Sequence, residues 1–126
     1  MLTFIELWNP NARWMSLSPA QQEGFVQRLV HRIEQLDGPG GIEMVGWGSQ
    51  LPGLQHPLRF KLFAIWRVPT EHDLQRVQQV LRDVHWYDYV DQRNVSGELL
   101  PPPTALRKYM VGCSAESIAP DAAAAS

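Results

Sequence analysis

The sequence RFKLFAIWRVPTEHDLQRVQQVLRDV, residues 59–84, contains the clearest strand of the chain, followed at once by a helix. Residues 59–68 are rich in aromatic and aliphatic side chains, and Pro69 ends the strand. Thr70 is a helix N-cap residue, because its hydroxyl can accept a hydrogen bond from the first turn. Apolar residues then recur at helical spacing, at Leu74, Val77, Leu81 and Val84. This segment predicts a strand that runs directly into an amphipathic helix.

The N-terminal part of the chain repeats this order. Residues 2–8 predict a strand. Residues 18–21, Ser-Pro-Ala-Gln, are typical of a helix N-terminus, with a capping serine, a proline at the first helical position and a glutamine that can complete a capping box. The apolar stripe of this helix comprises Phe25, Leu29, Ile33 and Leu36. Glycine-rich residues 38–41 end the helix, and residues 42–48 predict a second strand.

The C-terminal third is less regular. Residues 85–95 are a fourth β-rich stretch, which we expect to form the last strand. After a spacer of three prolines, residues 104–111 fit either a short helix or a strand. Residues 113–126 are small, polar and alanine-rich, with too little apolar surface to offset the entropy of ordering them. We therefore expect one folded domain over residues 1–112 and a disordered tail over residues 113–126.

The order strand, helix, strand, strand, helix, strand is that of the ferredoxin-like unit. We expect an α+β fold with a four-stranded antiparallel sheet and both helices on one face. Both faces of the third strand are largely apolar. One carries Phe60, Leu62, Ala64 and Trp66, and the other carries Phe63 and Ile65 beside Lys61 and Arg67. A sheet with one face in water would alternate instead, so we expect a homodimer that packs sheet on sheet.

Several stretches resemble known proteins. They are FIELWN at 4–9, GWG at 46–48, FAIWRVP at 63–69 and WYDYVDQRNVSGE at 86–98. Through them residues 2–111 resemble a bacterial family of uncharacterised small proteins within the dimeric α/β-barrel superfamily. That superfamily includes antibiotic-biosynthesis-type monooxygenases, haem-degrading monooxygenases and polyketide cyclases. The resemblance implies a ferredoxin-like fold that dimerises into a barrel, and it implies no particular activity.

Composition excludes several classes of partner. The 126 residues carry 11 Lys and Arg against 13 Asp and Glu, a net charge of −2, so no strong positive field favours nucleic acid. No apolar stretch approaches the roughly 20 residues that span a membrane. The N-terminus lacks the features of a signal peptide, and we expect a cytoplasmic protein. One cysteine, Cys113, and four histidines without paired spacing predict no metal site, and we expect no cofactor.

Two residues are candidates for moving a proton. Glu6 lies in an apolar strand, where a carboxylate is costly unless it has a partner. It either pairs with Arg67 or Arg93, or lies in a pocket where a raised pKa lets it move a proton. His85 follows the second helix, where it is either favoured by the helix dipole or acts as a general acid or base at a pocket mouth. Glu43 raises the same question on the second strand, where an edge position would leave it in water.

The resemblance to the superfamily draws attention to Trp66. On the helix-facing side of its strand it would line the cleft between sheet and helices, or fill the core. Haem-degrading relatives place a tryptophan near this point. Those relatives also need an asparagine on the first strand and a histidine near the end of the second helix, and Asn9, His72 and His85 do not clearly match. We therefore expect no haem.

The fourth stretch crowds polar and aromatic groups together. In a regular strand one face would carry Tyr87, Tyr89, Asp91 and Arg93, and the other Trp86, Asp88, Val90, Gln92 and Asn94. Such a strand suits a pocket wall, where a few polar groups orient a ligand on an apolar surface. It equally suits a dimer interface, where Tyr, Trp and Arg are favoured. The two glycines that flank Trp47 favour a bulge or a close backbone approach.

Two functions fit these observations. The first is a small cofactor-independent enzyme or ligand-binding protein that takes an apolar or aromatic metabolite in a helix–sheet pocket, as a monooxygenase, cyclase or isomerase would. The candidate catalytic residues are then Glu6, His85 and Tyr87, and the candidate substrate-binding residues are Trp47, Trp66, Arg67, Tyr89 and Asn94. The alternative is a non-catalytic structural or partner-binding homodimer. The first requires the polar groups to converge on one cavity, and the second is favoured if ion pairs occupy them all.

Overall fold

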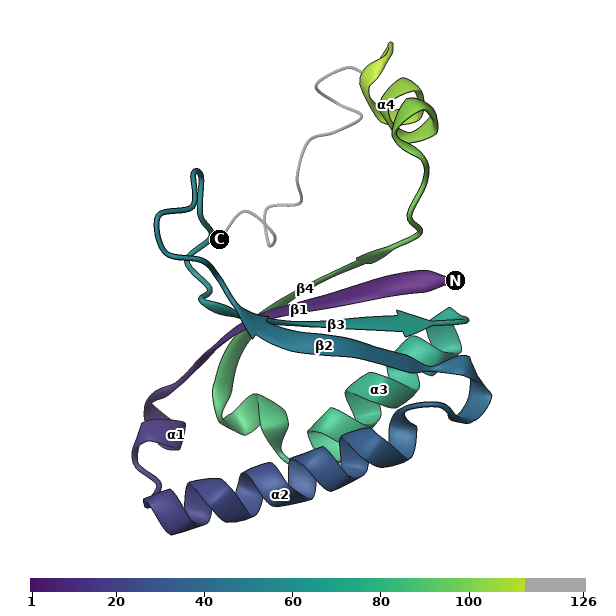
Figure 1. The fold of residues 1–126 in the computed structure, drawn as a ribbon. Helices are drawn as coiled ribbons and strands as arrows, with labels where there is room; N and C mark the ends of the chain where they lie inside the picture. The colour runs from purple at the N-terminus through teal and green to yellow at the C-terminus, as the bar shows by residue number, and fades with distance from the viewer. Residues whose placement is uncertain (113–126) are drawn as a thin grey trace.

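A computed structural model of the protein describes residues 1–112 (Figure 1). The elements in order are β1 (Leu2–Pro10), α1 (Ala12–Met15), α2 (Pro19–Leu36), the 3-10 turn η1 (Pro39–Gly41), β2 (Glu43–Ser49), β3 (Leu62–Val68), α3 (Glu71–Asp83), the 3-10 turn η2 (Trp86–Asp88), β4 (Val90–Gly97) and α4 (Pro102–Met110). The expected tail over 113–126 lies outside the described residues.

The four strands form one antiparallel sheet in the order β2-β3-β1-β4. Figure 1 shows α2 and α3 on the same side of this sheet. The predicted α+β ferredoxin-like fold is confirmed. Helix α4 rises from the other side, so residues 104–111, which the sequence left open, are largely helical.

Both main helices begin as the sequence predicts. The Ser18 hydroxyl accepts from the Gln21 backbone N–H at 3.2 Å, and the Ser18 N–H donates to the Gln21 side chain at 2.9 Å, which completes the capping box. The Thr70 hydroxyl accepts from the Asp73 N–H at 3.2 Å. A cap of this kind stabilises a helix by about 1 kcal/mol.

The core lies between the sheet and the helices. Phe4 on β1 is directly opposite Trp66 on β3, and both side chains are buried. Val77 and Leu81 of α3 and Leu29 of α2 pack on this layer from the helix side. Each large apolar side chain buried here stabilises the fold by about 1.5–3 kcal/mol.

The prediction of a strand over residues 85–95 is wrong at its start. His85 has a left-handed backbone (φ 65°), Trp86–Asp88 form a 3-10 turn, and β4 begins only at Val90. Packing overrides the β-propensity of the aromatic residues here, because Trp86 is buried in the core. Asn11, the residue after β1, fixes the turn, since its side chain donates to the Asp88 carbonyl at 3.0 Å. Tyr87 and Tyr89 therefore do not alternate along a strand.

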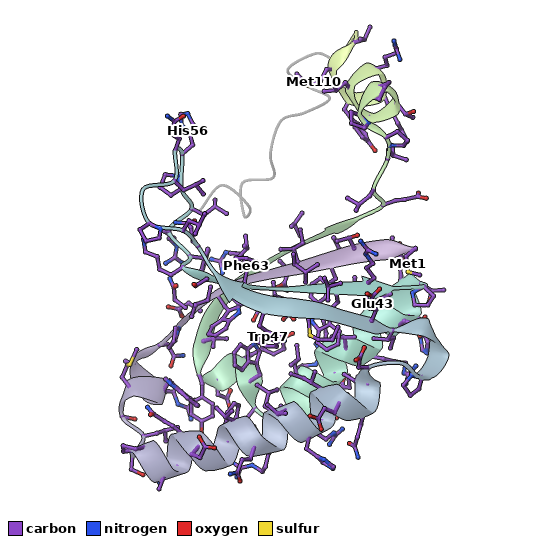
Figure 2. All side chains as sticks on the ribbon, viewed as in Figure 1. Met1, Glu43, Trp47, His56, Phe63 and Met110 are labelled. Carbon is purple, nitrogen blue, oxygen red and sulfur yellow. The ribbon has the colours of Figure 1, made fainter. Side chains whose placement is uncertain are left out.

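The face of the sheet turned away from α2 and α3 is largely aliphatic at its centre. Ile5 is directly opposite both Ile65 and Val95, and Leu7 is opposite Phe63. These side chains are half-buried, except Val95, which is 54% exposed. Figure 2 shows that His56, at the tip of the 50–61 loop, and Met110, on α4, rise beyond this face at its two ends. We call this surface the open face.

Candidate functional site

A groove runs between α2 and the sheet. It has a volume of about 410 Å³. Its lining is almost entirely apolar and is drawn from both layers: Trp8, Pro10, Trp14, Phe25, Val26, Leu29, Val30, Ile33, Glu34, Met44, Trp47, Leu62, Trp86 and Val90. Val26 and Val30 on α2 are 40% and 45% exposed, so this side of the groove opens to solvent.

A β-bulge in β2 sets the position of Trp47. The register of β2 against β3 shifts between Met44, which pairs with Trp66, and Gly46, which pairs with Ile65. The extra residue brings Met44 and Trp47 to the same face, where a regular strand would place them on opposite faces. Trp47 lies between β2 and α2 in Figure 2, and its indole N–H donates to the Met44 sulfur at 2.9 Å.

The second glycine beside Trp47 serves a close approach. A Cβ built on Gly48 would lie 2.9 Å from the ring of Phe63, the residue that pairs with it on β3. The bulge and the close approach are the two roles that the sequence suggested for these glycines.

Three indoles meet in the wall of the groove. The ring centroids are 4.9 Å apart for Trp8 and Trp86, 5.4 Å for Trp47 and Trp86, and 5.7 Å for Trp8 and Trp47. All three pairs meet edge to face, the geometry that aromatic quadrupoles favour. Phe25 extends the wall by stacking on Trp86 at 6.4 Å. The result is a rigid aromatic surface on one side of the groove.

Behind this wall lies a buried carboxylate with no cation beside it. Glu6 has no exposed surface. Its Oε1 accepts from Trp66 Nε1 at 2.7 Å, and its Oε2 accepts from Gln92 Nε2 at 2.6 Å. The same Gln92 nitrogen donates to Asn94 Oδ1 at 2.7 Å, while Gln92 Oε1 accepts from Trp86 Nε1 at 2.8 Å. One glutamine thus connects Glu6 to an indole of the groove.

Burial raises the pKa of Glu6 to about 7, although the hydrogen bonds from Trp66 and Gln92 act to lower it. Burial also raises the pKa of the Tyr87 phenol, and the charge of Glu6 adds to this effect while Arg82 opposes it. The Tyr87 hydroxyl is buried and has no hydrogen-bond partner within residues 1–112. Around neutral pH Glu6 is therefore poised between its two forms, beside a phenol that stays neutral.

The proposed ion pairs of Glu6 do not form. Arg67 pairs with Thr3, and Arg93 pairs with Leu7, so both lie on the open face. Arg67 instead lies 4.0 Å from the Glu43 carboxylate, and both side chains are more than half exposed. Successive side chains of a strand point to opposite faces of the sheet, so these two arginines and Glu6 lie on opposite faces.

The remaining candidates from the sequence lie apart from the groove. Trp66 is fully buried behind it, and Asn94 is exposed at the far end of the Gln92 network. His85 is 73% exposed, with its Nδ1 3.3 Å from the Asp88 carboxylate. Tyr89 packs edge-on against Phe25 at 5.0 Å without lining the groove. Of the eight candidate site residues, the groove lining includes Trp47.

Sequence reasoning missed part of the lining. Val26 and Val30 lie beside the predicted apolar stripe of α2 and make it wider than packing on the core requires. This extra width was the signal in the sequence that could have indicated the groove. In the sequence Gln92 is one of several polar residues of its strand, and no local pattern distinguishes it. Its role depends on the register of β4 against β1, which sets it opposite Trp8.

The residues do not fit a haem site. Asn9 is engaged with the loop before β3: its side chain donates to the Arg59 carbonyl at 3.2 Å and accepts from the Lys61 N–H at 2.8 Å. His72 is exposed in the first turn of α3, and His85 is not among the residues that line the groove. Within residues 1–112, no three His, Cys, Asp or Glu side chains cluster as metal ligands would. In the same part of the chain, no helix is long and apolar enough to cross a membrane.

Several solved structures share the fold. The chain superposes on a protein provisionally named chlorite dismutase TA0507 with a TM-score of 0.59 and 11% identity, over 79% of this chain but 44% of that one. It matches the Arabidopsis thaliana protein At3g17210 with a TM-score of 0.56 and 8% identity, over 80% and 97% of the two chains. A dimeric ferredoxin-like protein of unknown function from Thermobifida fusca gives 0.50 and 15%, over 78% and 90%.

At these identities the likeness concerns the fold alone, and this chain spans less than half of the TA0507 protein. No protein of curated function matches the sequence. Residues 1–111, which include every residue of the groove and of the Glu6 network, match one sequence family. The chain belongs to the family of unknown function DUF6616.

Proposed function

We propose that the protein binds a small, uncharged apolar molecule with aromatic character in the groove between α2 and the sheet. The observation that carries this proposal is the groove itself, about 410 Å³ of space with an almost wholly apolar lining. Ligand sites are mostly apolar clefts of about 300–1,000 Å³, and this groove combines such a volume with such a lining.

The aromatic wall favours an aromatic ligand. Trp8, Trp47 and Trp86 hold one another edge to face, so a flat ring in the groove would find both faces and edges of indoles to pack on. Each such contact contributes about 0.5–1.5 kcal/mol beyond the burial of area. The one charged group of the lining is Glu34, which is exposed to solvent. A charged ligand would therefore lose its hydration without gaining a partner inside.

Binding is supported better than catalysis. Glu6 is the one buried carboxyl of the described core, and it does not line the groove. A monooxygenase-, cyclase- or isomerase-like role would require Glu6 to reach the ligand past Trp86 and Gln92. A general acid or base has to lie within hydrogen-bond reach of the proton that it moves.

Fluorescence titration with N-phenylnaphthylamine, an uncharged aromatic probe, tests the proposal. Val30→Glu places a charge in the groove at a position that is already 45% exposed, and we expect it to weaken probe binding at least tenfold. His31→Glu is the matched control, because it adds the same charge at the next, exposed position of α2 without touching the lining. Equal loss in both variants, or no binding by the wild type, would overturn the proposal.

We also propose that the open face packs against a second copy of the chain. Ile5, Leu7, Phe63 and Ile65 make a contiguous aliphatic and aromatic centre, and Arg67 and Glu43 lie toward its edge. One of the proteins that share the fold is described as a dimeric ferredoxin-like protein, which supports this proposal. A stable interface of this kind buries about 1,600 Å² or more in total.

A further inference from the structure

We propose that Glu6, acting through Gln92, positions the Trp86 wall of the groove, so that protonation of Glu6 weakens ligand binding. The inference concerns regulation of the groove and rests on the function proposed above. In it Glu6 is a positioning residue, since it does not touch the space where the ligand would lie.

The order of donors and acceptors in the network carries the argument. Trp66 and Trp86 can only donate through their indole nitrogens. Gln92 has one donating and one accepting end. With Glu6 ionised, the donating end faces Glu6 Oε2 at 2.6 Å, which leaves the accepting end for Trp86 Nε1 at 2.8 Å. Each of these side-chain contacts then joins a donor to an acceptor.

A proton on Glu6 disturbs this order. Both oxygens of Glu6 accept from a donor, but the Gln92 amide can turn to present an acceptor and the Trp66 indole cannot, so the proton is favoured on Oε2, which faces Gln92. Two donors would then meet at that contact. If the amide of Gln92 turns to present its oxygen to Glu6, its nitrogen faces Trp86 Nε1 instead, and the conflict moves to the groove wall. In that arrangement Trp86 loses the hydrogen bond that its indole N–H donates to Gln92.

The side chains that face Glu6 do not change charge near neutral pH, so Glu6 is the group of this network that titrates. On η2 it faces Tyr87, whose raised pKa keeps the phenol neutral, and Arg82 of α3 acts on Tyr87. From β3 and β4 it faces the neutral side chains of Trp66 and Gln92. The pKa of Glu6, about 7, places the change in the neutral range. His85, next to Trp86 in the chain, has its Nδ1 3.3 Å from the Asp88 carboxylate, and it is the neighbouring group for which the experiment needs a control.

The test is a titration with N-phenylnaphthylamine between pH 8.5 and 5.5, with near-UV circular dichroism of the protein alone over the same range. We expect the wild-type dissociation constant to rise about fivefold on acidification, the equivalent of one neutral hydrogen bond, with a midpoint near 7. Glu6→Gln mimics the protonated acid, and we expect weak binding at every pH and no step. His85→Asn is the control, because asparagine tolerates the left-handed backbone at this position and should retain the step.

The outcomes separate this inference from the function on which it rests. A wild type that binds the probe with the same affinity at every pH overturns the inference, and so does a step that survives in Glu6→Gln or disappears in His85→Asn. Absence of probe binding at every pH overturns the proposed function. The dichroism of the tryptophans then still tests the positioning by Glu6, since a transition near pH 7 that is absent from Glu6→Gln supports it and no transition contradicts it.

Discussion

The two faces of the sheet are both largely apolar, but they accommodate their carboxylates differently. The covered face combines indoles with a carboxylate that has no cation beside it, and hydrogen bonds from Trp66 and Gln92 are its partners. The open face has an aliphatic centre and places its carboxylate, Glu43, at the edge within 4.0 Å of Arg67. Hydrophobic burial with an ion pair at the rim is what an interface needs. Indoles around an unfilled space, with a titrating group behind them, are what a ligand site needs.

A charge in the centre of the open face gives the largest expected effect. Ile65→Asp would bury two unpaired carboxylates across a two-fold interface, each costing several kcal/mol. We expect the dimer dissociation constant to rise more than a thousandfold, measured by sedimentation velocity. The monomer should stay folded, since Ile65 is only half-buried in one chain.

Gln75→Asp, on the solvent side of α3, is the matched control for this charge. It should leave the dissociation constant unchanged. A wild type that sediments as a monomer at micromolar concentration would remove the contrast between the faces, because the open face would then tolerate water.

The covered face can be tested through the pH dependence of folding. The pKa of Glu6 is about 7 in the folded state, against 4.5 for a fully solvated glutamate, so between these values the folded state binds more protons than the unfolded state. Its contribution to stability is therefore lost as the pH rises from 4.5 to 7, by about 3 kcal/mol in full. The free energy of unfolding of Glu6→Gln minus that of the wild type should therefore be about 3 kcal/mol larger at pH 8 than at pH 4.5.

Urea unfolding at fixed protein concentration measures this difference, because comparison at each pH cancels the other titrating groups. If the two proteins lose stability in parallel as the pH rises, Glu6 does not titrate with a raised pKa.

The sequence predicts the fold well because the signals of the fold are local. The capping residues Ser18 and Thr70 and the apolar stripes of the two helices each depend on a few neighbouring positions. The fourth strand was predicted too early for the opposite reason. Its first aromatic residues form a turn because Trp86 is buried in the core, and that burial is decided by distant residues.

The candidate site could be predicted only in part. The burial of Glu6 in an apolar strand was visible, but its partner was not, because the register between strands decides which side chains meet. The register sets Gln92 beside Trp8 and leaves Arg67 and Arg93 on the other face. The bulge that turns Trp47 into the groove also depends on pairing with β3.

Truncating the groove wall should weaken binding while the chain stays folded. Trp47 is 36% exposed, so Trp47→Ala removes two edge-to-face contacts and part of the wall without opening the core. We expect the affinity for N-phenylnaphthylamine to fall about tenfold, with roughly 2–3 kcal/mol of stability lost because the contacts and the buried part of the indole are both removed. Val95→Ala is the control on the open face, where 54% of the side chain is exposed, and it should leave probe binding unchanged. Equal affinities of the two variants would place the probe outside the groove.

The smallest effect is expected from the second glutamate. Glu43→Gln makes the same chemical change as Glu6→Gln, but at a side chain that is 56% exposed and only 4.0 Å from a partner that is itself 52% exposed. Water already solvates both charges, and a surface pair of this kind contributes about 0–1 kcal/mol. We expect a stability change below about 0.5 kcal/mol by urea unfolding. Raising the salt concentration should shrink even this difference, since it screens exposed charges and leaves the buried Glu6 largely unaffected. A change at Glu43 as large as that at Glu6 would mean that the proposed interface extends beyond the aliphatic centre of the open face and buries the Glu43–Arg67 pair as well.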